Sequence, residues 1–263
     1  AAGAIKAVLV VQVDTASGVV NDIPAIARAI HDTGHDALLM VDTVASLGCM
    51  PFAMDAWGID VAMSAAQKGL MTPPGLAFVA ANARARAAHR RAGLRTPYWD
   101  WSARDGEEHY RKYAGTAPVH LLFALRAALD LLFGEGLEMA FTRHRLLAGA
   151  VRAAVAAWAR GGGPSFNIEA APERADTVTA LLMPGGYDPA VLATYCRDRC
   201  NVVLGTGIDD LDGRGFRIAH MGHVNAPMIL GTLGVVETGL RALGIPHGVG
   251  GATAAIDYLA TAV

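Results

Sequence analysis

Short, continuous apolar segments recur through the first third of the chain, at residues 4–12, 36–42, 59–66 and 75–81. Each is rich in Val, Ala, Leu or Ile and lacks the strict alternation of a strand that faces water on one side. Such segments are typical of strands that are buried on both faces. They predict an α/β fold with a mostly parallel sheet that carries helices on both faces.

The segment between the first two strands has the pattern of a helix. Residues 23–34 repeat apolar side chains at helical spacing, Asp22 precedes them as a candidate N-cap, and Pro24 lies in the first turn. Gly34 follows as a candidate terminator. These signals predict one helix that connects two neighbouring parallel strands.

The rest of the chain mixes helices and strands after an aromatic and charged loop region. We expect residues 1–135 to form part of a large domain, and residues 136–263 to form a smaller C-terminal α/β domain. The predicted helices are 119–133, 137–160, 188–199, 226–243 and 253–262, and the predicted strands are 177–184, 201–207 and 213–222.

Composition and charge narrow the class of protein. The formal net charge of -2 gives no electrostatic basis for binding nucleic acid or an anionic membrane surface. No apolar run is long enough for a membrane span, and no basic leader precedes an apolar stretch, so we expect a cytoplasmic protein. The cysteines are Cys49, Cys196 and Cys200, and without further soft ligands nearby they predict free thiols rather than a metal site.

Polar side chains follow three of the predicted strands. Thr15 and Ser17 follow the first, Asp42 ends the second, and Lys68 follows the third. The chain has only three lysines among 22 basic residues, and arginine cannot replace an amine that must lose its proton. Because ligands of open α/β sheets bind beyond the carboxyl ends of the strands, an acid and an amine there suit pyridoxal phosphate. A solvated loop lysine and a helix-capping aspartate are the alternatives.

Several motifs in order along the chain point to one family. The stretch VDTVASLGCMPFAMDAWGIDVAMSAAQKGL, residues 41–70, resembles the cofactor core of class V aminotransferases, which have fold type I. More narrowly, it is similar to the alanine–glyoxylate and serine–glyoxylate aminotransferase branch. The same resemblance runs through VVQVDTASGV, KYAGTAPVHLLFALRAAL, EGLEMAFTRH and GRGFRIAHMGHVN.

This resemblance implies roles for residues around a pyridoxal 5'-phosphate cofactor. Lys68 would bond covalently to the cofactor aldehyde and act as the catalytic amine. Asp42 would pair with the ring nitrogen, and Thr15 would hydrogen-bond to the phenolic oxygen. Gln67 would contact the phosphate. No metal is implied.

The resemblance also implies residues that reach the substrate and a second subunit. Arg217 would bind the substrate α-carboxylate, for which a planar guanidinium is suited; a structural ion pair is the alternative. Tyr113 and Thr116 would reach the phosphate of the partner subunit's cofactor, which predicts a homodimer with shared active sites. His220 and His223 are either pocket residues or structural histidines.

The implied activity is transamination of a small L-amino acid, namely serine, alanine or aspartate. Glyoxylate is the expected acceptor, and the products are a 2-oxo acid and glycine. The family carries a longer N-terminal segment with a Gly/Ser-rich phosphate-binding loop, so we expect this chain to be a fragment or to work with a companion segment. The alternatives are another class V enzyme, such as a lyase or a cysteine desulfurase, and an inactive truncated relative.

Overall fold

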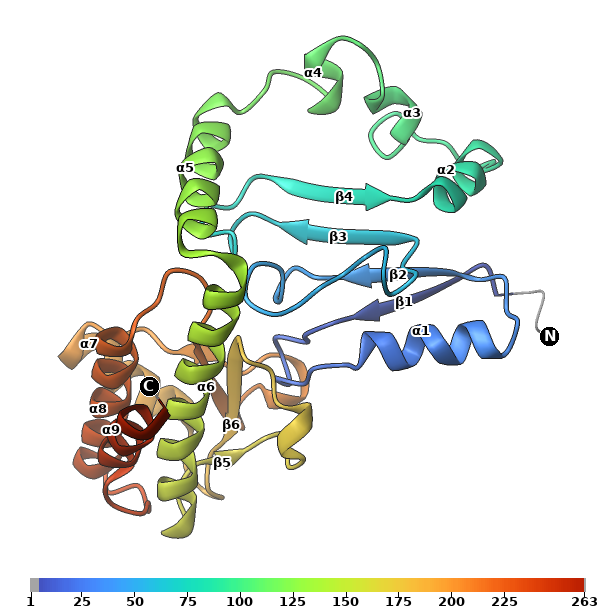
Figure 1. The fold of residues 1–263 in the computed structure, drawn as a ribbon. Coiled ribbons are helices and arrows are strands. Elements are labelled where there is room, and N and C mark those ends of the chain that lie inside the picture. Colours follow the sequence, from blue (N-terminus) through green and yellow to red (C-terminus); the bar gives the residue numbers. More distant parts are fainter. Residues whose placement is uncertain (1–4, 263) are drawn as a thin grey trace.

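The structure is a computed structural model that describes residues 5–262, and it contains two four-stranded sheets (Figure 1). In the first sheet the strand order is β1-β2-β3-β4, with β1, β2 and β3 parallel and β4 antiparallel to β3. These strands confirm the four predicted ones. Their bounds are β1 Ala7–Val11, β2 Leu38–Asp42, β3 Val61–Ala65 and β4 Ala77–Ala81.

The antiparallel direction of β4 follows from the connection before it. No helix lies between Ala65 and Ala77, and the segment carries the Pro73-Pro74-Gly75 sequence. A parallel neighbour would require a crossover connection, usually a helix. A short connection without a helix therefore returns β4 beside β3 in the opposite direction.

One face of this sheet is covered by α1 (Ile23–Asp32). Leu39 and Val41 of β2 are buried there together with Ile23. The helix begins as predicted, since the side chain of Asp22 accepts a hydrogen bond from the backbone N–H of Ala25. On the opposite face, apolar side chains stay exposed in three strands: Leu9 (75 %), Met63 (41 %) and Val79 (52 %).

A segment of short helices follows β4 and arches away from the sheet (Figure 1). Two longer helices, α5 and α6, then form a column beside the edge at which β1, β2 and β3 end (Figure 1). The bounds of these helices are α2 Ala83–Arg90, α3 Trp101–Arg104, α4 His109–Lys112, α5 Val119–Glu135 and α6 Leu137–Arg160.

The second sheet has the order β5-β6-β8-β7 and is antiparallel throughout. Trp158 and Phe216 are fully buried in its core, which α6, α7, α8 and α9 share. The predicted strand at 201–207 is shorter than expected, and the predicted division into domains at residue 135 stays a prediction. The bounds are β5 Ser165–Phe166, β6 Val178–Leu182, β7 Gly205–Thr206, β8 Gly215–Ala219, α7 Pro189–Cys200, α8 Ala226–Ala242 and α9 Gly251–Ala262.

Candidate functional site at the carboxyl edge of the first sheet

The three parallel strands end at the same edge, as their register shows. Val11 of β1 lies opposite Asp42 of β2, and Asp42 lies opposite Met63 of β3. Asp42 is half-buried, and its Oδ1 accepts a hydrogen bond of 2.7 Å from the backbone N–H of Val44. Within residues 5–262 its second carboxylate oxygen, Oδ2, has no hydrogen-bond partner. One carboxylate oxygen is therefore available to a ligand.

Lys68 lies in a tight turn directly after β3. The backbone N–H of Met71 donates to the carbonyl of Lys68, and the N–H of Thr72 donates to the carbonyl of Ala66. The side chain of Lys68 is half-buried, and within the described residues its ammonium has no hydrogen-bond or ion-pair partner. The predicted amine and the predicted acid thus follow neighbouring strands, and both keep unused polar atoms.

The loop after β2 packs tightly against the Lys68 turn. A Cβ placed on Gly69 would lie 2.2 Å from the carbonyl oxygen of Leu47 and 2.6 Å from the Sγ atom of Cys49. Such distances leave no room for any side chain at position 69. The absence of a side chain on Gly69 therefore lets the Lys68 backbone approach the loop that follows Asp42.

Thr15 lies in a loop after β1 that is organised by Asp14. The carboxylate of Asp14 accepts hydrogen bonds from the backbone N–H groups of Ala16 (3.0 Å) and Ser17 (3.1 Å) and from the Ser17 hydroxyl (2.6 Å). Burial raises the pKa of Asp14, but these hydrogen bonds and the charge of Arg217 outweigh it, so the pKa lies below its ordinary value. The carboxylate is held ionised and fixes the loop that carries Thr15.

Arg217 of β8 reaches this loop from the second sheet. Its Nη1 donates to the carbonyl oxygen of Thr15 at 2.8 Å, and its Nε donates to the carbonyl oxygen of Thr206 at 2.8 Å. A guanidinium carries five N–H groups. The remaining three, on Nη1 and Nη2, are free among the described residues, so an oriented fork remains for a carboxylate.

Two side chains that we did not single out in the sequence complete the contact between the sheets. Asp14 is one, and its position three residues before Ser17 is a recognisable turn signal. Asn167 is the other, and its Nδ2 donates to the carbonyl of Ser17 at 2.9 Å. No local pattern marks Asn167, because its partner lies 150 residues earlier in the chain.

Three of the predicted cofactor-binding residues lie apart from these contacts. Gln67 is exposed beside Lys68, and Tyr113 and Thr116 are exposed after α4. Within residues 5–262, no hydrogen bond connects the side chains of Tyr113 and Thr116 with Asp42, Lys68 or the Thr15 loop. Their proposed contact is with a partner subunit, and a single chain does not test it.

The two histidines beside the arginine strand differ in environment. His220 is fully buried; its Nδ1 lies 2.9 Å from the carbonyl of Asp176 and its Nε2 lies 2.9 Å from the Thr179 hydroxyl. Burial lowers the pKa of His220 to about 3. His220 is therefore a neutral structural residue, whereas His223 is exposed on the following turn.

Cys49 and Cys196 do not form a nucleophilic site. Cys49 and Cys196 are 1 % and 0 % exposed, and burial raises the pKa of each thiol to about 11. A thiolate is the reactive form of cysteine, so both thiols are poorly suited to attack. In the described part of the chain, no group of three or more His, Cys, Asp or Glu side chains is arranged to hold a metal ion.

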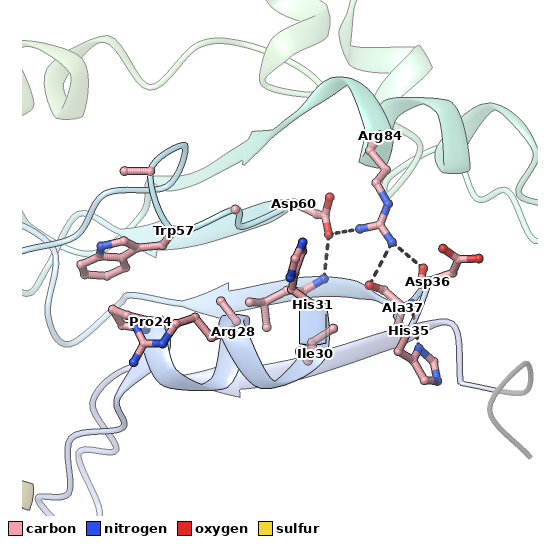
Figure 2. A pocket seen from close by; sticks show the side chains of 14 residues that line it. Pro24, Arg28, Ile30, His31, His35, Asp36, Ala37, Trp57, Asp60 and Arg84 are labelled. Atoms are coloured by element: carbon pink, nitrogen blue, oxygen red, sulfur yellow. Dashed lines mark hydrogen bonds and ion pairs between the residues drawn. The ribbon is translucent and has the colours of Figure 1, made fainter. Parts of the chain in front are cut away.

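A separate hollow of about 620 Å³ lies beside α1 and the segment 56–60 before β3, and none of the predicted site residues lines it (Figure 2). Its polar wall is built on Asp60, which is 2 % exposed and accepts hydrogen bonds from three groups. These are the backbone N–H of Leu39 (2.8 Å), the amide of Asn82 (3.0 Å) and the guanidinium of Arg84 (2.6 Å). Asp60 therefore joins β2 to the start of α2.

The arrangement at the carboxyl edge agrees with a comparison of the whole chain with known families. Residues 2–209 match the model of the family described as aminotransferase class-V. The chain belongs to this family. Its membership confirms the resemblance found in the sequence, and the fold class is confirmed by solved structures.

Relatives of the class-V family extend the comparison. The chain is 40 % identical over 261 residues to the serine–glyoxylate aminotransferase of Methylorubrum extorquens, covering 97 % of this chain and 64 % of that protein. It is 37 % identical over 253 residues to the L-aspartate–glyoxylate aminotransferase of Paracoccus denitrificans, covering 95 % and 62 %. The crystal structure of the ureidoglycine–glyoxylate aminotransferase of Bacillus subtilis superposes with a TM-score of 0.85 at 29 % identity, covering 96 % and 65 %. The chain thus spans less than two thirds of the length of these proteins.

The donor set suits the cofactor that the family implies. Pyridoxal phosphate requires an amine for its aldehyde and an anionic partner for its ring nitrogen. Lys68 and Asp42 supply these groups at the ends of adjacent strands, each with a polar atom that no described residue uses. The glycine at position 69 allows the close backbone approach that brings the two loops together.

Proposed function

We propose that this chain belongs to a pyridoxal 5'-phosphate-dependent aminotransferase that acts on a small L-amino acid, with serine, alanine and aspartate as the candidate donors. Glyoxylate is the proposed acceptor, so that the products are a 2-oxo acid and glycine. One observation carries this proposal. The amine of Lys68 and a carboxylate oxygen of Asp42 follow neighbouring strands, and the guanidinium fork of Arg217 reaches the loop after β1. Each keeps polar atoms that no residue among 5–262 uses.

Four residues would hold the cofactor within one subunit. Asp42 would face the ring nitrogen, Thr15 the phenolic oxygen and Gln67 the phosphate, and Lys68 would carry the covalent bond. When bound, the cofactor supplies an electron sink for the charge that develops at the substrate α-carbon. The carboxylate of Asp42 would favour the protonated ring nitrogen because opposite charges stabilise each other at short range.

The chain's own residues would bind the substrate and move its proton. Arg217 would hold the substrate α-carboxylate with the N–H groups that the carbonyls of Thr15 and Thr206 leave free. The Nζ atom of Lys68, displaced by the substrate amine, would take the proton from the substrate α-carbon and pass it to the aldehyde carbon of the cofactor. Since Arg217 is already anchored by two carbonyls, its fork would be oriented before the substrate arrives.

The donor and the assembly are parts of the same proposal. One relative is named for serine and the other for aspartate, so both donors need to be compared. We propose a homodimer in which Tyr113 and Thr116 reach the partner subunit's cofactor, and their exposure supports such a contact. In the described residues no helix has the length and apolar character to cross a membrane. We propose the cytoplasm as the compartment, and a division into domains at residue 135.

The test is covalent trapping of the cofactor. The chain is incubated with pyridoxal phosphate, reduced with borohydride and digested, and the modified lysine is found by mass spectrometry. We expect the label on Lys68 in the native chain and its loss in Lys68→Ala. Lys112→Ala is the matched control, because Lys112 is exposed on α4 and should leave the labelling unchanged. Equal labelling of Lys68 and Lys112 in the native chain would contradict the proposal.

Turnover then separates the possible donors. The native protein is assayed with serine, alanine and aspartate against glyoxylate, and glycine is measured as the product. Formation of glycine in the native protein and its loss in Lys68→Ala would support the proposed reaction. Labelling of Lys68 without glycine formation from any donor would reject glyoxylate as the acceptor while keeping the cofactor site.

A further inference from the structure

Two consecutive residues of α6, Arg143 and His144, hydrogen-bond to the turn around Gly222. This turn follows β8, the strand that carries Arg217. His144 is 1 % exposed, and its Nδ1 donates to the carbonyl of Ala140 at 2.7 Å. Its Nε2 is therefore the acceptor nitrogen of the neutral ring, and it accepts the backbone N–H of Gly222 at 3.0 Å. The fixed tautomer makes His144 a specific partner for this one backbone group.

Arg143 binds the same turn by donating hydrogen bonds to two backbone carbonyl groups of the turn. Its Nη1 donates to the carbonyl oxygens of Gly222 (2.8 Å) and Val224 (3.0 Å). Its Nε and Nη2 form a two-pronged ion pair with Glu135, at 2.6 and 2.8 Å. Because both carboxylate oxygens of Glu135 hold the guanidinium, its remaining N–H groups are fixed in direction.

The turn that contains Gly222 also packs against the turn that contains Lys68, which follows β3 of the first sheet. Gly222 has a φ of +86°, and a Cβ at this position would lie 3.5 Å from the carbonyl oxygen of Lys68 and 3.4 Å from Cγ of Met71. The same turn follows directly after β8, which carries Arg217. One short segment therefore connects the strand of the carboxylate-binding arginine with the turn of the amine.

We infer that Arg143 and His144 are positioning residues that set the place of the Lys68 turn relative to Arg217. Both side chains act through the backbone of the Gly222 turn, to which they hydrogen-bond. The inference rests on the proposed function, because only an α-amino acid substrate requires a fixed distance between the Lys68 amine and the Arg217 guanidinium. Its structural content, the contact between the two turns, is measurable without any cofactor.

Cys49 provides a reporter of this contact within the native chain. Its Sγ lies 2.6 Å from the position that a Cβ would take on Gly69, so Cys49 packs against the glycine next to Lys68. Cys49 is 1 % exposed, so it reacts with an alkylating reagent only when the loop beside the Lys68 turn opens. Cys196 is 0 % exposed in the core of the second sheet and reports global unfolding.

The experiment compares alkylation of the two thiols, resolved by peptide mass spectrometry, in the native chain and in variants. We expect His144→Leu and Arg143→Met each to raise the Cys49 rate about tenfold relative to Cys196, the effect of losing about one buried hydrogen bond. His144→Gln can still accept from the Gly222 N–H and should restore most of the protection. Arg152→Met is the matched control, since Arg152 lies on the same helix and binds the carbonyls of Arg174 and Ala175 instead.

Two results would overturn the inference. The first is a Cys49-to-Cys196 ratio in both variants that equals that of the native chain, because the pair would then have no local effect. The second is a parallel rise of both thiols in His144→Leu and Arg143→Met, because the pair would then support only global stability. A local rise in Cys49 that His144→Gln does not restore would also count against a role for the His144 acceptor.

A second readout separates this inference from the proposed function. Borohydride trapping of pyridoxal phosphate on Lys68 is expected to fall severalfold in His144→Leu and Arg143→Met and to recover in His144→Gln. Absence of trapping in the native chain would reject the proposed function, and the cysteine ratio alone would then decide the inference. Undiminished trapping in both variants with an increased Cys49 ratio would reject the link to Lys68.

Discussion

The guanidinium of Arg217 donates a hydrogen bond to the carbonyl oxygen of Thr15, 2.8 Å away and 202 residues earlier in the chain. This bond joins β8 of the second sheet to the loop that follows β1 of the first sheet. Its consequence is that two predicted site residues, separated by most of the chain, lie in contact. The contact involves the backbone of Thr15, and its hydroxyl has no hydrogen-bond partner in the part of the chain that the structure describes.

The first prediction concerns the fork of Arg217. Arg217→Lys keeps the positive charge but loses the planar pair of donors, so we expect kcat/KM for the amino donor to fall by about tenfold to a hundredfold. The measurement is steady-state transamination by the full-length enzyme. Arg214→Lys is the control, because Arg214 is exposed and, among residues 5–262, its side chain hydrogen-bonds to the carbonyl of Asp210 alone. Equal effects of the two substitutions would contradict carboxylate binding by Arg217.

The second prediction concerns stability at acid pH. Burial lowers the pKa of His220 from 6.5 to about 3, so below pH 6.5 the unfolded chain binds a proton that the folded chain does not. The free energy of unfolding should therefore fall as the pH decreases from about 6.5 towards about 3. Burial also lowers the pKa of His144 and adds to the same trend.

Urea unfolding at a series of pH values measures this effect. His220→Asn removes the titrating group, so its unfolding free energy should depend less steeply on pH in that window than that of the native chain. The exposed His31→Asn is the control and should keep the native slope. A slope for His220→Asn identical to that of the native chain would show that His220 is not the titrating group.

The third prediction concerns the glycine after Lys68. A Cβ at position 69 would collide with the carbonyl of Leu47, so Gly69→Ala must displace either the Lys68 turn or the loop after β2. We expect a loss of about 1–3 kcal/mol in the free energy of unfolding, typical of overpacking. Thermal or urea unfolding measures it. Gly185→Ala is the control, because a Cβ at Gly185 meets no atom within 4 Å, and an equal loss there would contradict the steric explanation.

The fourth prediction concerns Asp60, which directly precedes β3 at the amino end of that strand (Figure 2). Asp60→Ala leaves the buried N–H of Leu39 without its acceptor and removes the ion pair with Arg84. The expected destabilisation is about 1–3 kcal/mol, the usual result of leaving one buried polar group unsatisfied. Unfolding in urea measures it, with the exposed Asp55→Ala as control. Destabilisation no greater than that of Asp55→Ala would show that Asp60 does not hold this edge together.

Local patterns were sufficient to predict the elements of the first sheet. The runs at 36–42 and 59–66 contain the observed β2 and β3, and Asp22 caps α1 as expected. These signals are reliable because apolar continuity and capping act between residues close in the chain. The position of Asp42 and Lys68 at strand ends followed from the same reasoning, since strand ends can be read from the pattern.

The hydrophobic pattern thus predicted the strands of the first sheet and the edge where Asp42 and Lys68 lie, and the resemblance of residues 41–70 and four further motifs predicted the family. Only the tertiary structure decided that Arg217 binds the carbonyl of Thr15, that Asn167 binds the same loop, and that His144 accepts the N–H of Gly222. Each of these contacts joins segments more than seventy residues apart. The chemistry of a side chain can be read from the sequence. The partner of a polar group is decided by how distant segments pack, and no pattern within one segment records that packing.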